Sequence, residues 1–380
     1  MMNFQLSKEH EMARQLFRTF AIEEVKPLAQ EVDEEERFPI ETIEKFKQFG
    51  FLGIPFAKEF KGQGCDILTY IMAVEEMSKV CGTTGVILSA HTSLCGSPIN
   101  DFGTQEQKEK YLTRVASGEA IGAFGLTEPG AGTDAAGQQT KAVRDGDNYI
   151  INGNKIFITN ADYADVFIVM AMTDKSKGTR GISAFIVDRK YPGFSIGKKE
   201  LKMGIRGSAT SELIFQDCVV PKENLIGKEG EGFKIAMKTL DGGRIGIAAQ
   251  ALGIAQGAID ETVKYTKERK QFGRSISKFQ NTQFQLADMQ AKVDAARLLV
   301  YRAACCKDNK QPYSVEAAMA KLFAAETAME VTTKAVQLHG GYGYTRDYPV
   351  ERMMRDAKIT EIYEGTSEVQ RMVISANMLK

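Results

Sequence analysis

The sequence has no excess of positive or negative charge, few histidines and no long apolar run. Its 380 residues include 49 Lys plus Arg and 49 Asp plus Glu, so no overall basic field points to nucleic acid or anionic lipid as a partner. The three histidines form no cluster and the six cysteines show no CxxC spacing, which argues against a structural zinc site. No stretch approaches the roughly 18 apolar residues that a membrane span needs.

The N-terminus and the cysteines bear on localisation. Residues 1–6 lack the basic segment followed by an apolar one that marks a signal peptide. Free thiols are the ordinary state of cysteines in a reducing cytoplasm. The sequence therefore predicts a cytoplasmic protein with unpaired cysteines and no targeting segment.

Three regions of different pattern follow one another along the chain, which is longer than a single hydrophobic core usually allows. The first region is predicted to be helical, because helix-start residues precede apolar residues at helical spacing. The start signals are Ser7, Pro39, Asp66 and Thr104, and Gly50 is a stop signal.

The middle region is predicted to be a small β domain. Residues 148–151 and 155–158 flank Asn152-Gly153, a dipeptide typical of a two-residue hairpin turn. Because no helical pattern alternates with the strands, an antiparallel barrel or sandwich fits better than a parallel sheet. Further strands are expected at 165–173, 182–187 and 211–220.

The last region is predicted to be a four-helix bundle, because it holds long Ala-rich segments with helical periodicity. These segments are residues 233–267, 279–308, 314–338 and 366–378. The expected fold is mainly α with a central β domain. Its predicted domains are a helical domain at 1–119, the β domain at 120–230 and the bundle at 231–380.

Two motifs of the middle region could hold a flat polar ligand. Gly130 and Gly132 lie in a hydroxyl-containing turn whose backbone N–H groups could approach a ring or a phosphate. No βαβ unit surrounds them, so a Rossmann dinucleotide site is rejected. Phe157 and Thr159 stand at the end of a predicted strand, where a ring and a hydroxyl could pack a flavin. An ordinary surface turn and ordinary core packing explain the two motifs equally simply.

Three motifs of the last region are also candidates. Residues 269–273 offer a cation and an aromatic ring, and residues 337–343 end a predicted helix with glycines. Glu364 precedes Gly365 just before a helix that Thr366 could cap, which would place a carboxylate at a helix N-terminus. Taken singly, each motif is explained by an ordinary helix end, and only their joint order along one chain is specific.

The chain resembles the acyl-CoA dehydrogenase family over essentially its whole length, and within it the short-chain, butyryl-CoA dehydrogenase type. Two long motifs carry the resemblance, residues 122–134 (GAFGLTEPGAGTD) and 362–368 (IYEGTSE). It implies FAD-dependent oxidation of a short-chain acyl-CoA to the trans-2-enoyl-CoA, with electrons passed to electron-transferring flavoprotein. It also implies the helical–β–helical fold and a homotetramer built as a dimer of dimers.

The resemblance also implies roles for single residues. The implied FAD contacts are Phe124, Leu126, Thr127, Thr133, Phe157, Thr159, Arg269, Phe272, Gln337, Gly341, Thr366 and Glu368. A neighbouring subunit would supply Arg269, Phe272, Gln337 and Gly341. The implied substrate contacts are Thr133, Asp241, Arg244, Tyr363 and Gly365. Many relatives have Gln where this chain has Glu368, which is a departure from the usual pattern.

Glu364 matches the usual base of the family. Some branches place the base near position 243 instead, where this chain has Gly243, which cannot serve. Glu364 would remove the α-proton of the thioester while the β-hydrogen leaves as hydride to flavin N5. The thioester oxygen would accept hydrogen bonds from the Glu364 backbone N–H and from a flavin ribityl hydroxyl. Desolvation by Tyr363 and by substrate would raise the Glu364 pKa toward the operating pH.

Several alternatives stay open at the level of the sequence. An acyl-CoA oxidase or a nitroalkane-oxidase-like enzyme has the same fold, although the oxidases usually carry an extra domain. The enzyme could work mainly as a crotonyl-CoA reductase in butyrate formation, or could prefer branched or medium-chain substrates. A different class is a non-catalytic, acyl-CoA-binding flavoprotein.

Overall fold

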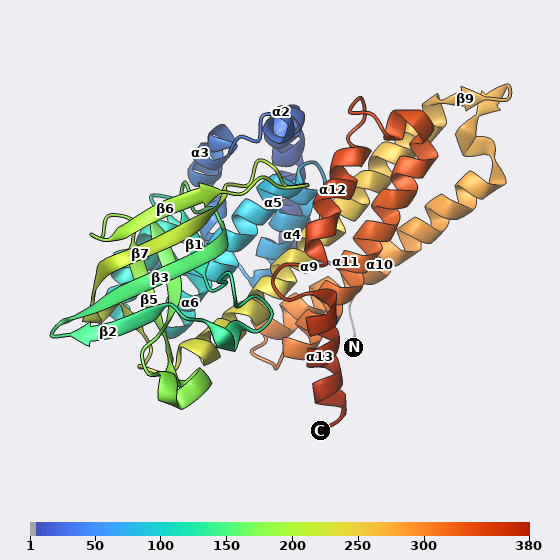
Figure 1. Ribbon diagram of the computed structural model, residues 1–380. Coiled ribbons are helices and arrows are strands. Elements are labelled where there is room, and N and C mark those ends of the chain that lie inside the picture. Colours follow the sequence, from blue (N-terminus) through green and yellow to red (C-terminus); the bar gives the residue numbers. More distant parts are fainter. Residues whose placement is uncertain (1–4) are drawn as a thin grey trace.

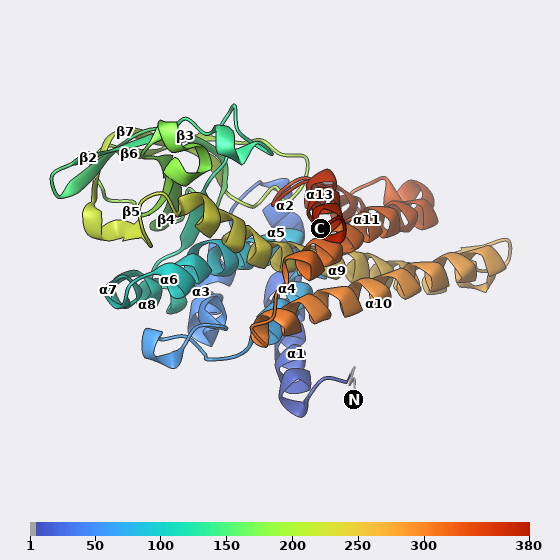
Figure 2. The same cartoon turned by 90° about the horizontal axis from the view of Figure 1, so that it is seen from below.

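The structure is a computed structural model that describes residues 5–380, and along the chain a helical region precedes and another follows a β region (Figure 1). The predicted fold class is therefore confirmed. The sheet lies at one side of the molecule, and the long helices of the last region extend away from it (Figures 1 and 2). One of these helices begins beside the sheet and continues to the far end of the bundle, so it connects the two halves of the molecule.

The predicted helix caps of the first region are present. The Ser7 hydroxyl accepts a hydrogen bond from the His10 backbone N–H at 3.2 Å, and the Asp66 carboxylate accepts one from Thr69 at 2.8 Å. These local bonds satisfy backbone groups that a helix end otherwise leaves unpaired. The helices are α1 (Lys8–Phe20), α2 (Ala29–Glu34), α3 (Ile40–Phe49), α4 (Ile67–Ser78), α5 (Gly82–Ser89), α6 (Ser97–Phe102), α7 (Gln105–Gln107) and α8 (Thr113–Ala116).

The middle region forms one mixed, mainly antiparallel, eight-stranded sheet. Its strands follow the order β6-β7-β3-β2-β4-β5-β8, and β1 pairs with β4. The pairs β1–β4 and β2–β4 are parallel, and the others are antiparallel. The strands are β1 (Gly122–Gly125), β2 (Lys141–Asp145), β3 (Asn148–Thr159), β4 (Val166–Met172), β5 (Ile182–Asp188), β6 (Phe194–Lys199), β7 (Thr210–Pro221) and β8 (Leu225–Ile226).

The predicted hairpin turn at Asn152-Gly153 is wrong. Strand β3 continues through both residues, and its pairing with β7 is irregular between Ile151 and Gly153, as in a β-bulge. The Asn152 side chain is used in the sheet, since its amide nitrogen donates to Asp217 Oδ1 at 3.0 Å and its oxygen accepts from the Asp217 N–H at 2.8 Å. The true two-residue turn lies at 146–147, between the paired residues Asp145 and Asn148.

The last region contains the four predicted helices and one that was not predicted. The predicted ones are α9 (Gly232–Glu268), α10 (Gln280–Asp308), α11 (Ser314–His339) and α13 (Ser367–Met378). The additional helix, α12 (Val350–Thr360), is short and rich in charge, and it buries Val350, Met353 and Ala357. A small hairpin, β9 (Lys270–Gln271) and β10 (Arg274–Ser275), joins α9 to α10.

Helix α9 is the central element of the core, and glycines allow α4 to approach it closely. A Cβ at Gly253 would lie 2.3 Å from the Glu75 carbonyl oxygen, and a Cβ at Gly257 would lie 2.0 Å from that of Lys79. The backbones of the two helices therefore touch where larger residues would separate them. None of the helices formed by residues 5–380 combines the length and apolar character that crossing a bilayer requires.

Candidate active site

Glu364 lies in a strained turn between α12 and α13. Its φ is 52° and that of Gly365 is 91°, and only glycine adopts such angles without strain. Thr366 then caps α13, because its hydroxyl accepts a hydrogen bond from the Val369 N–H at 3.3 Å. In proteins, strained non-glycine residues cluster at functional sites, where the backbone orients a side chain for binding or catalysis.

The turn directs the Glu364 carboxylate onto α9 at Gly243. A Cβ at Gly243 would lie 2.0 Å from Glu364 Oε2 and 2.8 Å from Cδ2 of Leu94. Any larger residue at position 243 would therefore displace the carboxylate. Oε2 is buried and has no hydrogen-bond partner among residues 5–380, which is unusual for a buried polar atom and leaves an acceptor for a ligand.

Two buried cations, Lys321 and Arg244, lie near Glu364 without pairing with it. Burial raises the pKa of Glu364 to about 8, and the positive charges of Lys321 and Arg244 act in the opposite direction. Arg244 is itself buried and donates to Asp241 Oδ1 at 2.7 Å, while Asp241 also accepts from the Ser314 hydroxyl. Asp241 and Arg244, both predicted for substrate binding, thus lie on the stretch of α9 that Glu364 contacts.

Tyr363 is held on the other side of the turn. Its hydroxyl donates to Gln250 Oε1, and Gln250 in turn donates to the Gly82 carbonyl oxygen at 2.9 Å. Burial raises the pKa of Tyr363 well above its ordinary value, so the phenol stays neutral. The side chain also packs against a small apolar cluster that includes Ile205 and Ile247. Tyr363 is therefore well placed to keep water from Glu364.

Two polar side chains of this site were not found from the sequence. Lys321 is 0% exposed and donates from Nζ to the Gly365 carbonyl oxygen at 2.8 Å. Gln370 donates to the same oxygen at 2.7 Å. A usable signal existed for Lys321, because it is a single charged residue on the Ala-rich face of a helix. The signal for Gln370 was absent, because nothing local distinguishes a buried glutamine from an exposed one.

Five predicted cofactor residues of the middle region lie in or directly after β1 and near the end of β3: Phe124, Leu126, Thr127, Phe157 and Thr159, while Thr133 lies in the loop that follows β1. The Ile156 N–H donates to the Thr127 carbonyl oxygen at 2.9 Å, which joins the two strand ends. Beneath them lies the buried Lys155, whose Nζ is 2.8 Å from Glu128 Oε1 and 3.1 Å from the Leu126 carbonyl oxygen. This buried ion pair fixes the Gly-rich turn against the strand.

This surface is suited to a flat aromatic cofactor. Phe157 is 59% exposed and has a φ of 59°, so a large apolar ring is held outward in a strained conformation. Thr127 and Thr159 are half-buried beside it. A Cβ at Gly130 or Gly132 would meet nothing within 4 Å. The glycines therefore face open space, where backbone groups are accessible to a ligand. These features fit an isoalloxazine ring and its polar chain.

The remaining predicted cofactor contacts lie far away at the end of the bundle. Phe272, in the β9–β10 turn, is 94% exposed, and Arg269 stacks on Tyr342 at 5.4 Å. Tyr265, near the end of α9, donates to the His339 carbonyl oxygen at 3.1 Å, which brings the end of α11 with Gln337 and Gly341 to the same place. Figure 1 shows this end opposite the sheet. A single chain therefore does not bring the two sets together.

Comparison with known proteins gives matches along the whole chain. The family models described as "Acyl-CoA dehydrogenase, N-terminal domain", "middle domain" and "C-terminal domain" match residues 7–119, 123–218 and 230–379. A relative from Clostridium acetobutylicum, "Acyl-CoA dehydrogenase, short-chain specific", is 65% identical over 379 residues and covers 100% of both chains.

Two solved structures are similar to this one over their full length. The butyryl-CoA dehydrogenase of Megasphaera elsdenii is 52% identical with a TM-score of 0.98, and 100% of each chain is covered. A chain from a structure described as the electron transferring flavoprotein of Acidaminococcus fermentans, in a work on flavin-based electron bifurcation, is 60% identical. It has a TM-score of 0.99, again with 100% of each chain covered.

Proposed function

The chain belongs to the acyl-CoA dehydrogenase family, and from that premise we propose that it oxidises a short-chain acyl-CoA to the trans-2-enoyl-CoA with Glu364 as the base. Membership makes it an FAD-dependent oxidoreductase. The observation that carries the proposal is the Glu364 carboxylate. It is aimed at α9 by a strained turn, and one of its oxygens is buried without a protein partner.

The environment of Glu364 suits proton removal from carbon. The α-proton of a thioester is weakly acidic, so the base must be strong when ionised. Burial raises the pKa of Glu364 to about 8, which increases the basicity of the carboxylate near neutral pH. The Glu364 backbone N–H forms no hydrogen bond among residues 5–380. It would donate to the thioester oxygen while negative charge develops there.

We assign the surface at the ends of β1 and β3 to FAD. When bound, FAD supplies the two-electron acceptor that takes the β-hydrogen as a hydride. The outward ring of Phe157, the hydroxyls of Thr127 and Thr159 and the open backbone at Gly130 and Gly132 support the assignment. The full set that we assign to FAD on this side is Phe124, Leu126, Thr127, Thr133, Phe157, Thr159, Thr366 and Glu368.

We assign Arg269, Phe272, Gln337 and Gly341 to the FAD of a neighbouring subunit in a homotetramer. Their distance from the sheet in one chain supports this, as does the almost complete exposure of Phe272. An exposed phenylalanine in a protruding hairpin suits contact with a second molecule. Size-exclusion chromatography of Phe272→Ala should show weaker flavin retention. A monomer that keeps its full flavin content would contradict the assignment.

We further propose that Asp241, Arg244, Thr133, Tyr363 and Gly365 contact the acyl-CoA, and that electrons pass to electron-transferring flavoprotein. The similarity to the chain from the Acidaminococcus fermentans structure supports this partner. Because that structure concerns electron bifurcation, the enzyme would also reduce an enoyl-CoA when the partner supplies electrons at low potential. The direction depends on the partner and not on the base.

The decisive experiment is an anaerobic titration with butyryl-CoA. The flavin absorption of the parent protein should bleach, and that of Glu364→Gln should not, since the amide cannot accept the α-proton. Octanoyl-CoA and isobutyryl-CoA, used in parallel, test chain length and branching. If no acyl-CoA bleaches the flavin, the chain is better explained as a non-catalytic, acyl-CoA-binding flavoprotein. Rapid reoxidation of the reduced flavin by oxygen would favour an oxidase.

A further inference from the structure

Lys321 is a charged residue in a place that strongly disfavours charge. It lies on α11, is 0% exposed and has alanines at positions 317, 318, 320 and 324 as neighbours along the helix. Its hydrogen bond to the Gly365 carbonyl oxygen at 2.8 Å is its polar contact. Among residues 5–380, no carboxylate lies close enough to Lys321 for an ion pair. A buried ammonium without a counter-ion in contact is expensive, so its retention calls for a reason.

The hydrogen bond alone is not that reason. The Gly365 carbonyl oxygen already accepts from Gln370 Nε2 at 2.7 Å, and Gln370 also reaches the Glu364 carbonyl oxygen at 3.4 Å. A neutral side chain thus holds the turn from the α13 side. What Lys321 adds is a second donor from α11 and a positive charge.

The charge of Lys321 acts mainly on Glu364. The other acids near it are Glu361, which is paired with Lys358 at 2.6 Å, and Glu368, which is exposed. The second cation near Glu364 is Arg244, whose charge is shared with Asp241 at 2.7 Å. Lys321 is therefore the positive charge at this site that no acid in contact neutralises, and a separated charge still acts strongly in a dry interior.

We propose that Lys321 is a positioning residue for the base: it fixes the Gly365 carbonyl of the strained turn and supplies a buried positive charge one residue away from Glu364. This rests on the proposed function of Glu364. Two phenols complete the surroundings, Tyr70 from α4 and the adjacent Tyr363, and burial raises the pKa of each, so neither contributes charge near neutral pH. Burial lowers the pKa of Lys321 to about 8, and Glu364 opposes this.

The expected consequence is a specific change in pH dependence. Removing the cation destabilises the Glu364 carboxylate, so its pKa should rise by about one unit or more in Lys321→Met. The rate of flavin reduction at sub-saturating butyryl-CoA reports the free enzyme, so its acid limb should move to higher pH by that amount. Near pH 7 the variant should be about tenfold slower, and at high pH the two rates should converge.

A donor-retaining variant and a matched control separate charge from packing. Lys321→Gln keeps a hydrogen-bond donor but not the charge, so it should show the same shift, and it replaces the Met variant if that one does not fold. Lys334→Met removes a half-buried lysine of the same helix, which is paired with Glu330 at 2.7 Å, and it should leave the acid limb unchanged. Infrared titration of the Glu364 carboxyl, identified by its loss in Glu364→Gln, reads the same shift without turnover.

The outcomes are distinguishable from failure of the proposed function. If Glu364→Gln reduces flavin as fast as the parent, the role of Glu364 as base is wrong. If Glu364→Gln is inactive while both Lys321 variants keep the parent acid limb, only the inference about Lys321 is wrong. A rate that falls equally at every pH would mean that Lys321 serves packing alone. If the acid limb shifts in Lys321→Met but not in Lys321→Gln, the positive charge of Lys321 does not cause the shift.

Discussion

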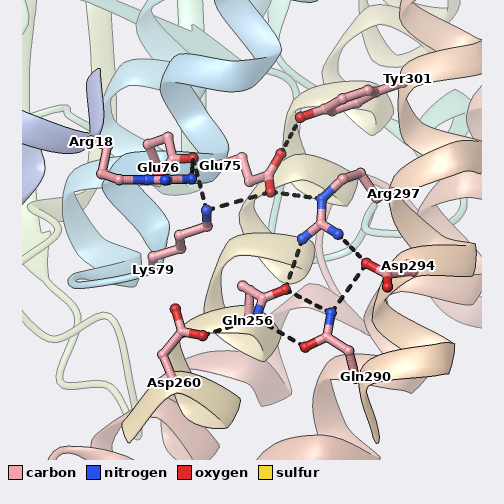
Figure 3. A network of polar contacts seen from close by, with 10 residues as sticks. All are labelled: Arg18, Glu75, Glu76, Lys79, Gln256, Asp260, Gln290, Asp294, Arg297 and Tyr301. Carbon is pink, nitrogen blue, oxygen red and sulfur yellow. Dashed lines mark hydrogen bonds and ion pairs between the residues drawn. The ribbon is translucent and has the colours of Figure 1, made fainter. Parts of the chain in front are cut away.

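Two places in the helical core bury glutamates, and they treat them in opposite ways. Figure 3 shows the first, where α1, α4, α9 and α10 meet. Glu75 there is 1% exposed and accepts hydrogen bonds from Arg297 at 3.1 Å and from the Tyr301 hydroxyl at 2.7 Å. The adjacent Glu76 is paired with Lys79 and Arg18. The second place is the turn of Glu364, where Oε2 has no partner among residues 5–380.

The difference separates an acid that stabilises the fold from one that is available for chemistry. A carboxylate whose oxygens are already hydrogen-bonded within the protein has no free acceptor to offer a ligand. At Glu364 no cation among residues 5–380 forms an ion pair with the carboxylate, and the backbone is strained. Burial raises the pKa of Glu364 to about 8. The strained backbone and the unpaired Oε2 of Glu364 both lower the stability of the fold, and they leave that oxygen free to react.

The comparison predicts the largest effect for Glu364→Gln. Removing the base should slow flavin reduction by butyryl-CoA by about 10³-fold, within the usual contribution of general base catalysis. The melting temperature should stay the same or rise, because the variant lacks a carboxylate that is costly to bury. Stopped-flow absorbance and thermal unfolding measure the two. A large loss of stability would place Glu364 in the same class as Glu75.

The opposite pattern is expected for Glu75→Gln. Arg297 would lose a charged partner in a buried place, and breaking such a pair costs about 3 kcal/mol. Urea unfolding should show this loss, while the rate of flavin reduction per folded subunit stays close to that of the parent. A slow but stable variant would mean that the network serves the active site rather than the fold.

The sequence was sufficient for the elements that local interactions determine. Ser7, Asp66 and Thr104 cap helices as predicted, because a cap is a contact between residues three apart. The Asn152-Gly153 turn failed for the complementary reason. A turn dipeptide competes with pairing to a distant strand, and Asn152 bonds to Asp217 of β7, which no local pattern reveals.

The candidate site divides in the same way. Glu364 was found through a motif that is contiguous in the chain, and Gly243 was singled out because it cannot act as a base. The 2.0 Å approach between a Cβ at that position and Glu364 Oε2 joins segments more than a hundred residues apart. The bond from Lys321 to Gly365 is also non-local, since the two residues are 44 positions apart. Such contacts depend on how α9, α11 and the turn pack, and one sequence does not specify that packing.

Gly243→Ala tests whether space at α9 is what makes Glu364 reactive. Alanine in a helix interior is usually favourable by about 1 kcal/mol, yet its Cβ would lie 2.0 Å from Oε2. The displaced carboxylate should slow flavin reduction by about 10²-fold, as small misplacements of catalytic groups do. Gly242→Ala is the matched control, because its Cβ would meet only the terminal Nζ of the Lys307 side chain, at 2.9 Å, and not Glu364. Equal rates in the two variants would contradict the steric argument.

Arg18→Met should have the smallest effect and shows how the paired network distributes its energy. Glu76 is 1% exposed, so it depends on its partners, but Lys79 would remain 2.7 Å away after Arg18 is removed. The Arg18 side chain is 44% exposed, and solvent weakens its share of the attraction. We therefore expect a loss of about 1 kcal/mol in the free energy of unfolding, at the upper end for such pairs. A loss as large as that of Glu75→Gln would mean that the network acts as one unit, in which each carboxylate requires every cation.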